Sequence, residues 1–560
     1  MSMTAALTES YGKGATDVPL IEQTIGDFFD DMVAKQPNRE ALVSRHEGRR
    51  YTYRELQAES NRLASALLKL GLVPGDRVGI WSHNNVPWVL MQIATAKAGL
   101  ILVNINPAYR TSELEYALNK VGCKALVTMA QFKTSDYLGM LRELGPTRLP
   151  QLAYTFWIDA KPGEGEEQHG MQRFSQLLAS GDASDPRVAQ VQKTLKATDP
   201  INIQFTSGTT GFPKGATLTH RNILNNGFFI GECMKLSPAD RLCIPVPLYH
   251  CFGMVLGNLA CLTHGSAIVY PNDGFDPLTV LETVQAEKCT ALHGVPTMFI
   301  AELDHPRFKE FDLSTLRTGI MAGSPCPIEV MKRVVSEMHL GEITIAYGMT
   351  ETSPVSCQSS TDTPLDRRVS TVGTVQPHLE VKIVDPETGA IMPPGKSGEL
   401  CTRGYSVMHG YWDDEAKTRE AIDAEHWMHT GDLATMDAEG YVNIVGRIKD
   451  MVIRGGENIY PREIEEFLYR HPKVQDVQVV GLPDPRYGEE LCAWIIVKPG
   501  QSATEDDIRE FCKGQIAHYK VPKYIRFVAE FPMTVTGKIQ KFKIRDEMKA
   551  QLGLDEARTA

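Results

Sequence analysis

Ten residues between two apolar runs combine hydroxyls, glycines and one lysine at a density typical of polyphosphate binding. They are Thr206-Ser207-Gly208-Thr209-Thr210-Gly211-Phe212-Pro213-Lys214-Gly215. Glycines let backbone N–H groups approach phosphate oxygens, hydroxyls add donors, and a lysine adds a point charge. The common P-loop needs Gly-x-x-x-x-Gly-Lys-Ser/Thr, whereas Gly215 follows Lys214 here. The segment therefore predicts a nucleotide site of another class, with a plain Gly/Ser/Thr loop as the alternative.

This phosphate-binding segment is expected to join two strands. Apolar and polar residues alternate from Ile201 to Phe205, directly before it, which predicts a strand. A second short strand over 216–218 and a helix from Thr219 are expected after it. Between residues 50 and 130, helical and strand-like runs alternate, as they do in βαβ units.

Three further segments complete the expected architecture. Residues 160–195 are polar and glycine-bearing, which predicts a surface excursion. Short runs separated by Pro/Gly turns over 380–445 predict a small β-rich subdomain. After Lys449 the pattern changes to a compact α+β unit, with helices expected over 461–469 and 504–513.

Composition limits the class of protein. The chain has 560 residues, of which 42% are hydrophobic and 23% charged, and a chain of this length can bury about 75% of its unfolded surface. No apolar run approaches the ~20 residues of a membrane span, and the N-terminal residues lack an apolar signal core or an Arg-rich transit pattern. Eleven scattered cysteines without a Cys-x-x-Cys pair argue against a disulfide framework or a zinc site. We expect a cytoplasmic protein with reduced thiols and no integral membrane segment.

The charge distribution favours small anionic ligands over nucleic acid. A net charge of −11 provides no basic field for nucleic acid. Positive charge is concentrated over residues 511–549, which hold nine Lys/Arg against three acids. This segment could attract anionic substrates, or it could be an ordinary solvated basic face.

Four motifs follow the phosphate-binding segment along the chain. They are Tyr347-Gly348-Met349-Thr350-Glu351, Thr430-Gly431-Asp432, Gly446-Arg447-Ile448-Lys449-Asp450 and Thr536-Gly537-Lys538. In this order and at this spacing, the five segments resemble the signatures of the adenylate-forming superfamily. That superfamily includes acyl-CoA synthetases, aryl-CoA ligases, firefly luciferase and peptide-synthetase adenylation domains. The chain is identified as a member of it.

The resemblance implies an α/β fold in two parts. A large N-terminal body, residues 1–448, would contain two βαβ-type subdomains plus a small β-barrel-like subdomain. A small mobile α+β lid, residues 449–560, would follow a hinge near Lys449. The implied ligands are ATP, Mg²⁺, coenzyme A and a small-molecule carboxylic acid. The oligomeric state stays open, with a homodimer as one arrangement.

The implied first half-reaction is attack of a carboxylate on the α-phosphate of ATP, which expels pyrophosphate. Both reactants are anions, so cations and donors must stand where charge accumulates. Lys538 could bridge the carboxylate and the α-phosphate, and Glu351 would carry Mg²⁺. Asp432 can accept both ribose hydroxyls, and Arg447 can reach ribose or phosphate. Each residue also has a plain alternative. Lys538 could be a surface lysine, and Glu351 could be an acid at a helix N-terminus. Asp432 could be a turn residue, and Arg447 could be an ion-pair partner.

Other positions follow the family pattern through resemblance alone. Two parts of the chain resemble the positions of the family that face the adenosine. One is the turn Gly323-Ser324-Pro325, and the other is Thr350, in the motif that begins at Tyr347. In the second half-reaction the CoA thiol would attack the adenylate after the lid has moved. Gly455-Gly456-Glu457 would then enter the site as Lys538 leaves it.

The acyl site is the least defined. His250 matches a position that lines the carboxylate entrance, with a buried core histidine as the alternative. Gly348 stands where acetyl-specific relatives have a tryptophan, so the resemblance implies room for a longer chain or a ring. Gly253 and Gly257 could thin a helix wall beside an acyl tunnel or permit close helix packing. The segment 294–296 could line the pocket or simply end a strand.

These features favour an acyl-CoA synthetase that activates a medium- to long-chain fatty acid. The alternatives are an aryl-acid CoA ligase, an acyl-AMP ligase that charges a carrier protein, and a luciferase-like oxygenase. A nucleotide-binding regulator without activity is expected to lack Lys538, Glu351 or Asp432, and all three are present.

Overall fold

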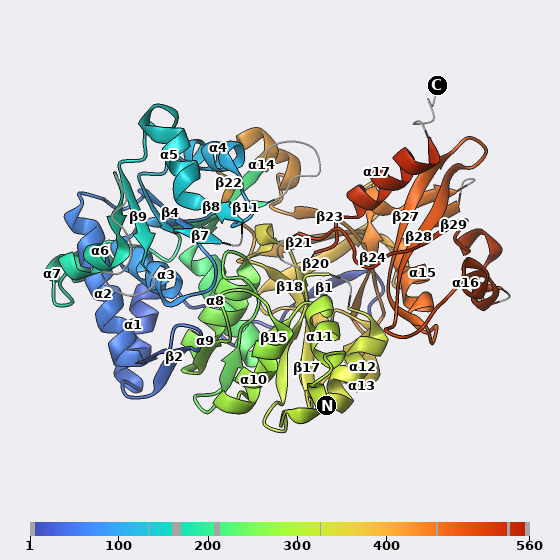
Figure 1. The fold of residues 1–560 in the computed structure, drawn as a ribbon, viewed down its shortest axis with the longest axis horizontal. Coiled ribbons are helices and arrows are strands. Elements are labelled where there is room, and N and C mark those ends of the chain that lie inside the picture. Colours follow the sequence, from blue (N-terminus) through green and yellow to red (C-terminus); the bar gives the residue numbers. More distant parts are fainter. Residues whose placement is uncertain are drawn as a thin grey trace.

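The computed structural model describes residues 6–132, 134–159, 170–206, 213–324, 326–454, 457–513, 515–534 and 538–554. It has a large body and a smaller C-terminal unit, drawn in orange to red in Figure 1. The body holds two large sheets, a five-stranded sheet and a two-stranded one, and the C-terminal unit has a sheet of its own. The expected α/β architecture is confirmed.

The first large sheet carries the phosphate-binding segment. Its strands are hydrogen-bonded in the order β10 (Gln172–Arg173), β9 (Tyr154–Ile158), β6 (Ala125–Met129), β4 (Arg77–Trp81), β5 (Ile101–Asn104), β11 (Pro200–Thr206), β12 (Lys214–Thr219) and β22 (Gly410–Tyr411). The sheet is parallel from β10 to β11 and antiparallel from β11 to β22. The helices of this subdomain are α2 (Tyr53–Lys69), α3 (Val86–Ala98), α4 (Thr111–Val121) and α5 (Tyr137–Arg148).

The second large sheet is parallel in its centre. Its order is β19 (Thr374–Val375), β18 (Val355–Gln358), β17 (Glu342–Gly348), β16 (Thr318–Met321), β15 (Ala291–Gly294), β13 (Arg241–Cys243), β14 (Ala267–Tyr270), β2 (Glu40–Ser44) and β3 (Arg49–Thr52). Its helices are α8 (His220–Cys233), α9 (Ala260–His264), α10 (Pro277–Glu287), α11 (Pro296–Leu303) and α12 (Ile328–Glu337). Helix α8 begins where the sequence predicts, because the Thr219 side chain accepts a hydrogen bond from the backbone N–H of Asn222.

A small antiparallel sheet confirms the expected β-rich subdomain. Its order is β1 (Tyr11–Lys13), β20 (Leu379–Val384), β21 (Gly398–Gly404), β23 (Met428–Met436) and β24 (Val442–Arg447). The remaining body elements are α1 (Ile25–Lys35), the two-stranded β7 (Gln131–Phe132) and β8 (Ser135–Asp136), α13 (Leu365–Ser370), α14 (Glu415–Ala421) and the short 3₁₀ turns η2 (Phe308–Glu310) and η3 (Thr350–Thr352).

The C-terminal lid is a compact unit with apolar clusters of its own. A short 3₁₀ turn, η4 (Ile448–Asp450), leads into it. Its strands are β25 (Val452–Arg454), β26 (Glu457–Ile459), β27 (Val474–Asp484), β28 (Gly488–Val497) and β29 (Tyr524–Phe527), and its helices are α15 (Pro461–Leu468), α16 (Glu505–Cys512), the 3₁₀ turn η5 (His518–Lys520) and α17 (Lys541–Leu552). The predicted helices over 461–469 and 504–513 are confirmed.

The described part of the segment 160–195 lies mostly at the surface, as expected, but it is anchored to the body by two short helices that the sequence analysis did not predict. Helices α6 (Phe174–Ser180) and α7 (Pro186–Gln192) form there and pack against α2. Phe174, Leu177 and Val188 are buried in the main apolar core. Each helix is only seven residues long, so its sequence contains too few turns to show a helical period. Residues 160–169 lie outside the described part of the chain.

Candidate active site

The carboxyl ends of two neighbouring parallel strands, β16 and β17, bring together the predicted adenosine-facing residues. Strands β15, β16 and β17 are paired in parallel, and ligands in open α/β sheets bind outside the carboxyl ends of such strands. Gly323 and Ser324 follow β16, and Tyr347 and Gly348 end β17. Thr350 follows in the turn η3. Pro325 lies outside the described residues.

The two strands that flank the phosphate-binding segment hold its ends together. Thr206 and Lys214 are direct partners across the β11–β12 pair, and the Thr206 hydroxyl donates to the backbone carbonyl of Lys214 at 3.4 Å. The predicted strand–loop–strand arrangement is therefore confirmed at both ends. The predicted phosphate ligands between them lie outside the described residues: Ser207, Gly208, Thr209, Thr210 and Gly211.

A hydrogen-bond chain joins the lysine that is expected to bind phosphate to the carboxylate that is expected to bind the metal. The Lys214 Nζ donates to the Tyr411 hydroxyl at 3.0 Å, and that hydroxyl donates to Glu351 Oε1 at 2.8 Å. Glu351 is 5% exposed. Tyr411 was missed by the sequence analysis because it lies about 200 residues from Lys214 and is brought there by the pairing of β22 with β12.

The expected ribose site has its carboxylate in place. Asp432 and Arg447 face each other across the β23–β24 pair, and Arg447 Nε lies 2.9 Å from Asp432 Oδ1. The other oxygen, Oδ2, accepts a hydrogen bond from the Tyr347 hydroxyl at 2.7 Å. Asp432 thus connects Tyr347, in the motif at residues 347–351, to Arg447, in the motif at residues 446–450. These two motifs are about 100 residues apart in the chain.

Lys538 of the C-terminal unit is close enough to the same group of body side chains to feel their charges. Desolvation by the surrounding protein and the nearby Arg447 guanidinium lower the pKa of Lys538, while Asp432 and Glu351 act in the opposite direction. Its backbone is held by Thr534: the Thr534 N–H donates to the Lys538 carbonyl at 2.8 Å, and the Lys538 N–H donates to Thr534 Oγ1 at 3.1 Å. The C-terminal unit therefore places this lysine within electrostatic range of Arg447, Asp432 and Glu351, and its catalytic role stays a prediction. Thr536 and Gly537 lie outside the described residues.

His250 is close enough to Lys538 to feel its positive charge, and its place at the carboxylate entrance stays a prediction. Burial and the positive charge of Lys538 lower the pKa of His250 to about 4, so its imidazole is neutral at physiological pH. A second histidine, His293, is fully buried and has a structural role. Its Nε2 lies 2.9 Å from the Leu256 carbonyl, and its Nδ1 lies 3.2 Å from the backbone N–H of Ile320.

The glycines of the expected acyl site have close neighbours. A Cβ atom at Gly348 would lie 1.6 Å from the backbone oxygen of Pro354. At Gly253 a Cβ would lie 2.4 Å from the Pro247 carbonyl oxygen, and at Gly257 it would lie 2.8 Å from the Ile244 side chain. Gly253 and Gly257 belong to a π-helix, η1 (Phe252–Leu259), and π-helical turns are frequent at functional sites. At both positions the absence of a side chain permits close packing.

Polar contacts fix the lid against the body. Arg462 donates to the Ile444 carbonyl at 2.6 Å, the Ile328 N–H donates to a Glu466 oxygen at 3.4 Å, and Gln475 donates to Asp304 at 3.1 Å. A groove of about 250 Å³ lies between β24 and α15.

The residues assigned to the hinge and to the second half-reaction are only partly described. Lys449 lies in η4, between the last body strand and the lid, so its hinge role stays a prediction. Gly455 and Gly456 lie outside the described residues, and Glu457 is described by its backbone, which pairs with Arg454.

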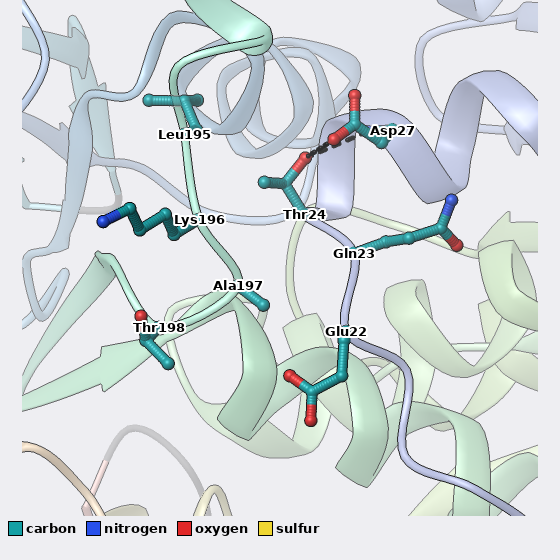
Figure 2. Close-up of a pocket in the computed structure, with 8 residues that line it drawn as sticks. All are labelled: Glu22, Gln23, Thr24, Asp27, Leu195, Lys196, Ala197 and Thr198. Carbon is teal, nitrogen blue, oxygen red and sulfur yellow. Dashed lines mark hydrogen bonds between the residues drawn. The ribbon is translucent and has the colours of Figure 1, made fainter.

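A larger surface pocket of about 420 Å³ lies elsewhere on the body. Figure 2 shows it between the start of α1 and the segment 195–198. Thr24 caps the helix there by accepting a hydrogen bond from the Asp27 N–H. The pocket contains none of the predicted site residues. Within the described residues, every helix is too short or too polar to span a bilayer.

The fold and the site define an AMP-binding enzyme, and the chain belongs to that family. Residues 29–412 match the family described as "AMP-binding enzyme", and residues 463–538 match the "AMP-binding enzyme C-terminal domain". The chain is 47% identical over 564 residues to a protein named mitochondrial medium-chain acyl-CoA ligase ACSF2 from Danio rerio, with 98% of this chain and 92% of the relative covered. It is 45% identical to the Homo sapiens protein of that name, with 97% and 91% covered.

A solved structure agrees with the fold. The anthranilate CoA ligase AuaEII, in complex with anthranoyl-AMP, superposes with a TM-score of 0.86 at 28% identity. The match covers 96% of this chain and 99% of the other. The superfamily membership expected from the sequence motifs is thus confirmed.

Proposed function

We propose that this protein is an ATP-dependent acyl-CoA synthetase that activates a medium- to long-chain fatty acid. The observation that carries the proposal is the way the fold brings the charged residues of separate motifs together: Lys214 is joined through Tyr411 to Glu351, and Asp432 pairs with Arg447. Relatives named as medium-chain acyl-CoA ligases, similar over nearly the whole chain, support the substrate class.

In the first half-reaction each charged residue of the site would contact a different part of the substrates. Asp432 would accept the ribose hydroxyls, and Arg447 would then be free to contact the ribose or a phosphate. The ammonium of Lys538 would lie between the fatty-acid carboxylate and the α-phosphate, where their negative charges meet. The carboxylate oxygen would bond to the α-phosphorus, the bond to the β-phosphate oxygen would break, and pyrophosphate would leave.

Glu351 is the residue that would hold Mg²⁺. Its buried carboxylate is connected to Lys214 by hydrogen bonds through the Tyr411 hydroxyl. It therefore lies next to the phosphate-binding segment. One carboxylate together with nucleotide phosphate oxygens is the ligand set that Mg²⁺ prefers. A bound Mg²⁺ would neutralise phosphate charge, while Tyr411 keeps the Glu351 carboxylate oriented.

In the second half-reaction the CoA thiolate would attack the acyl carbonyl, and AMP would leave with the bonding electrons. The lid would first rotate near Lys449 and bring the segment 455–457 to the site.

We also infer a cytoplasmic location. It is supported by all eleven cysteines being free thiols, as expected in a reducing compartment.

The test is pyrophosphate release with ATP and Mg²⁺ across straight-chain acids from C2 to C16 and several aryl acids, each with and without CoA. We expect an optimum among the middle chain lengths and turnover that depends on CoA. An aryl optimum would contradict the fatty-acid assignment and favour an aryl-acid CoA ligase, the class of the anthranilate enzyme with the same fold. Adenylation without CoA use would point to a carrier protein as the acceptor.

A further inference from the structure

The base of the ribose-binding turn holds a cluster of side chains that the adenylation chemistry does not use. Cys401 on β21 and His429 on β23 are direct partners in the sheet, and Glu399 is paired with Leu433. From one pair to the next, β21 covers two residues (399 to 401), whereas β23 covers four (429 to 433). Residues 430–432 therefore bulge out of the strand, and Asp432 stands at the end of the bulge.

Three different donor atoms meet beneath this bulge. His429 Nδ1 lies 2.9 Å from Glu399 Oε2 and 3.5 Å from Cys401 Sγ. One ligand atom from each of the three residues lies within 4.8 Å of the others. Bonds of 2.0–2.3 Å to a tetrahedral metal place neighbouring ligand atoms about 3.3–3.6 Å apart. Small side-chain rotations would therefore bring all three donors to one ion.

We propose that Glu399, Cys401 and His429 bind a divalent transition-metal ion of the Zn²⁺ class. A thiolate, an imidazole and a carboxylate together suit Zn²⁺ or Co²⁺, whereas Mg²⁺ and Ca²⁺ prefer oxygen ligands alone. Cys401 is fully buried, while 36% of the His429 side chain is exposed. The exposed side leaves room for a water molecule as the fourth ligand.

The surroundings of the histidine match those of a metal ligand. Its other nitrogen, Nε2, lies 3.6 Å from Asp423 Oδ2. The second Asp423 oxygen accepts hydrogen bonds from the N–H groups of Glu425 and Trp427, both at 2.9 Å. Metal-binding histidines usually donate their free N–H to such a fixed carboxylate. Nδ1 of His429 is then the nitrogen that faces the metal.

The cluster can take up an ion without disturbing the ribose bulge. Glu399 uses only Oε2 toward His429, and its Oε1 accepts a hydrogen bond from the Gly431 N–H at 3.0 Å. Two carboxylates, Glu399 and Asp423, therefore lie near the one imidazole of His429.

The direct test is metal content after equilibrium dialysis of the EDTA-treated full chain against Zn²⁺. We expect one ion per chain in the parent and in the matched control Cys233→Ser, whose cysteine is free and partly exposed. Cys401→Ser and His429→Asn should lose the ion. Asp423→Asn should weaken binding about ten-fold, because it alters only the orientation of the histidine.

Loading with Co²⁺ gives a second readout that identifies the ligand. Coordination by Cys401 should produce a thiolate-to-cobalt charge-transfer band in the near-ultraviolet. The band should be present in the parent and in Cys233→Ser, and absent in Cys401→Ser. If Cys401→Ser does not fold, as judged by circular dichroism, His429→Asn provides the comparison, since its side chain is partly exposed. A folded parent that retains no Zn²⁺, or equal retention in the folded variants, would overturn the proposal and leave an ordinary ion-paired cluster.

Discussion

Replacing Gly348 with alanine should distort the turn between β17 and β18, and the structure gives the size of the effect. The new Cβ would lie 1.6 Å from the Pro354 carbonyl oxygen, 2.6 Å from its carbonyl carbon and 2.9 Å from Val355 Cα. A carbon and an oxygen in contact are about 3.3 Å apart, so one of the two backbone segments must move by roughly 1.7 Å. All three neighbouring atoms are backbone, and no side-chain rotation can relieve the clash.

We expect a cost of about 3 kcal/mol, at the upper end of typical overpacking. With an unfolding entropy of about 2.1 cal/mol/K per residue over a body of roughly 450 residues, this lowers the Tm by about 3 °C. Turnover should fall by a similar factor for every chain length, because the distorted turn carries Thr350 and Glu351. Glycine at this position therefore has a backbone role, whether or not it also widens the acyl site.

The assay combines thermal denaturation with pyrophosphate release across acids of different length. Gly341→Ala is the matched control, because Gly341 directly precedes the same strand, β17, and its Cβ would meet no atom within 4 Å. The control should retain the parental Tm and activity. A Gly348→Ala variant with the parental Tm and a shorter preferred chain would refute the backbone argument and show that the glycine acts only by leaving space for the substrate.

Three further predictions concern single side chains. Lys538→Ala should lower the rate of pyrophosphate release about 10²–10³-fold while ATP binding persists. Release at the parental rate would contradict the role of Lys538. The control is Lys543→Ala, a change at an exposed residue of α17, which should release pyrophosphate at the parental rate. Asp432→Asn should raise KM for ATP about ten-fold by removing one charge-assisted acceptor, and an unchanged KM would exclude ribose contact. Burial raises the pKa of Glu302 well above its usual value, and neither of its oxygens has a hydrogen-bond partner within the described structure. The native state therefore keeps a proton that the unfolded chain loses, so this residue makes stability fall as pH rises above the unfolded pKa. Tm measured from pH 5 to 8 should fall less in Glu302→Gln than in the parent; parallel curves would contradict this.

The local elements were predictable because their signals are local. The run from Ile201 to Phe205 forms the strand β11 (Pro200–Thr206), since alternation of apolar and polar residues indicates a strand. The phosphate-binding segment and the lid helices follow from signals of the same kind. Tyr411 could not be found this way, because its role depends on the pairing of β22 with β12.

The cluster at Glu399, Cys401 and His429 was missed for a related reason. Cysteine spacing along the chain argues against a zinc site, yet the pairing of β21 with β23 places a carboxylate and a histidine beside one of the cysteines. Spacing arguments detect ligands that are close in sequence. They do not detect ligands that are contributed by two strands of a sheet.

Three hydrogen bonds between the lid and the body give a scale for part of the energy that holds the lid in place. A hydrogen bond contributes about 1 kcal/mol net, so the bonds made by Arg462, Glu466 and Gln475 together supply roughly 3 kcal/mol. A ligand that prefers one orientation by about 5.5 kcal/mol reverses a two-state population from 1:99 to 99:1. A change of bound phosphates that favours one orientation by this amount would outweigh these three bonds. The orientation expected for the lid would then follow the phosphates that remain in the site.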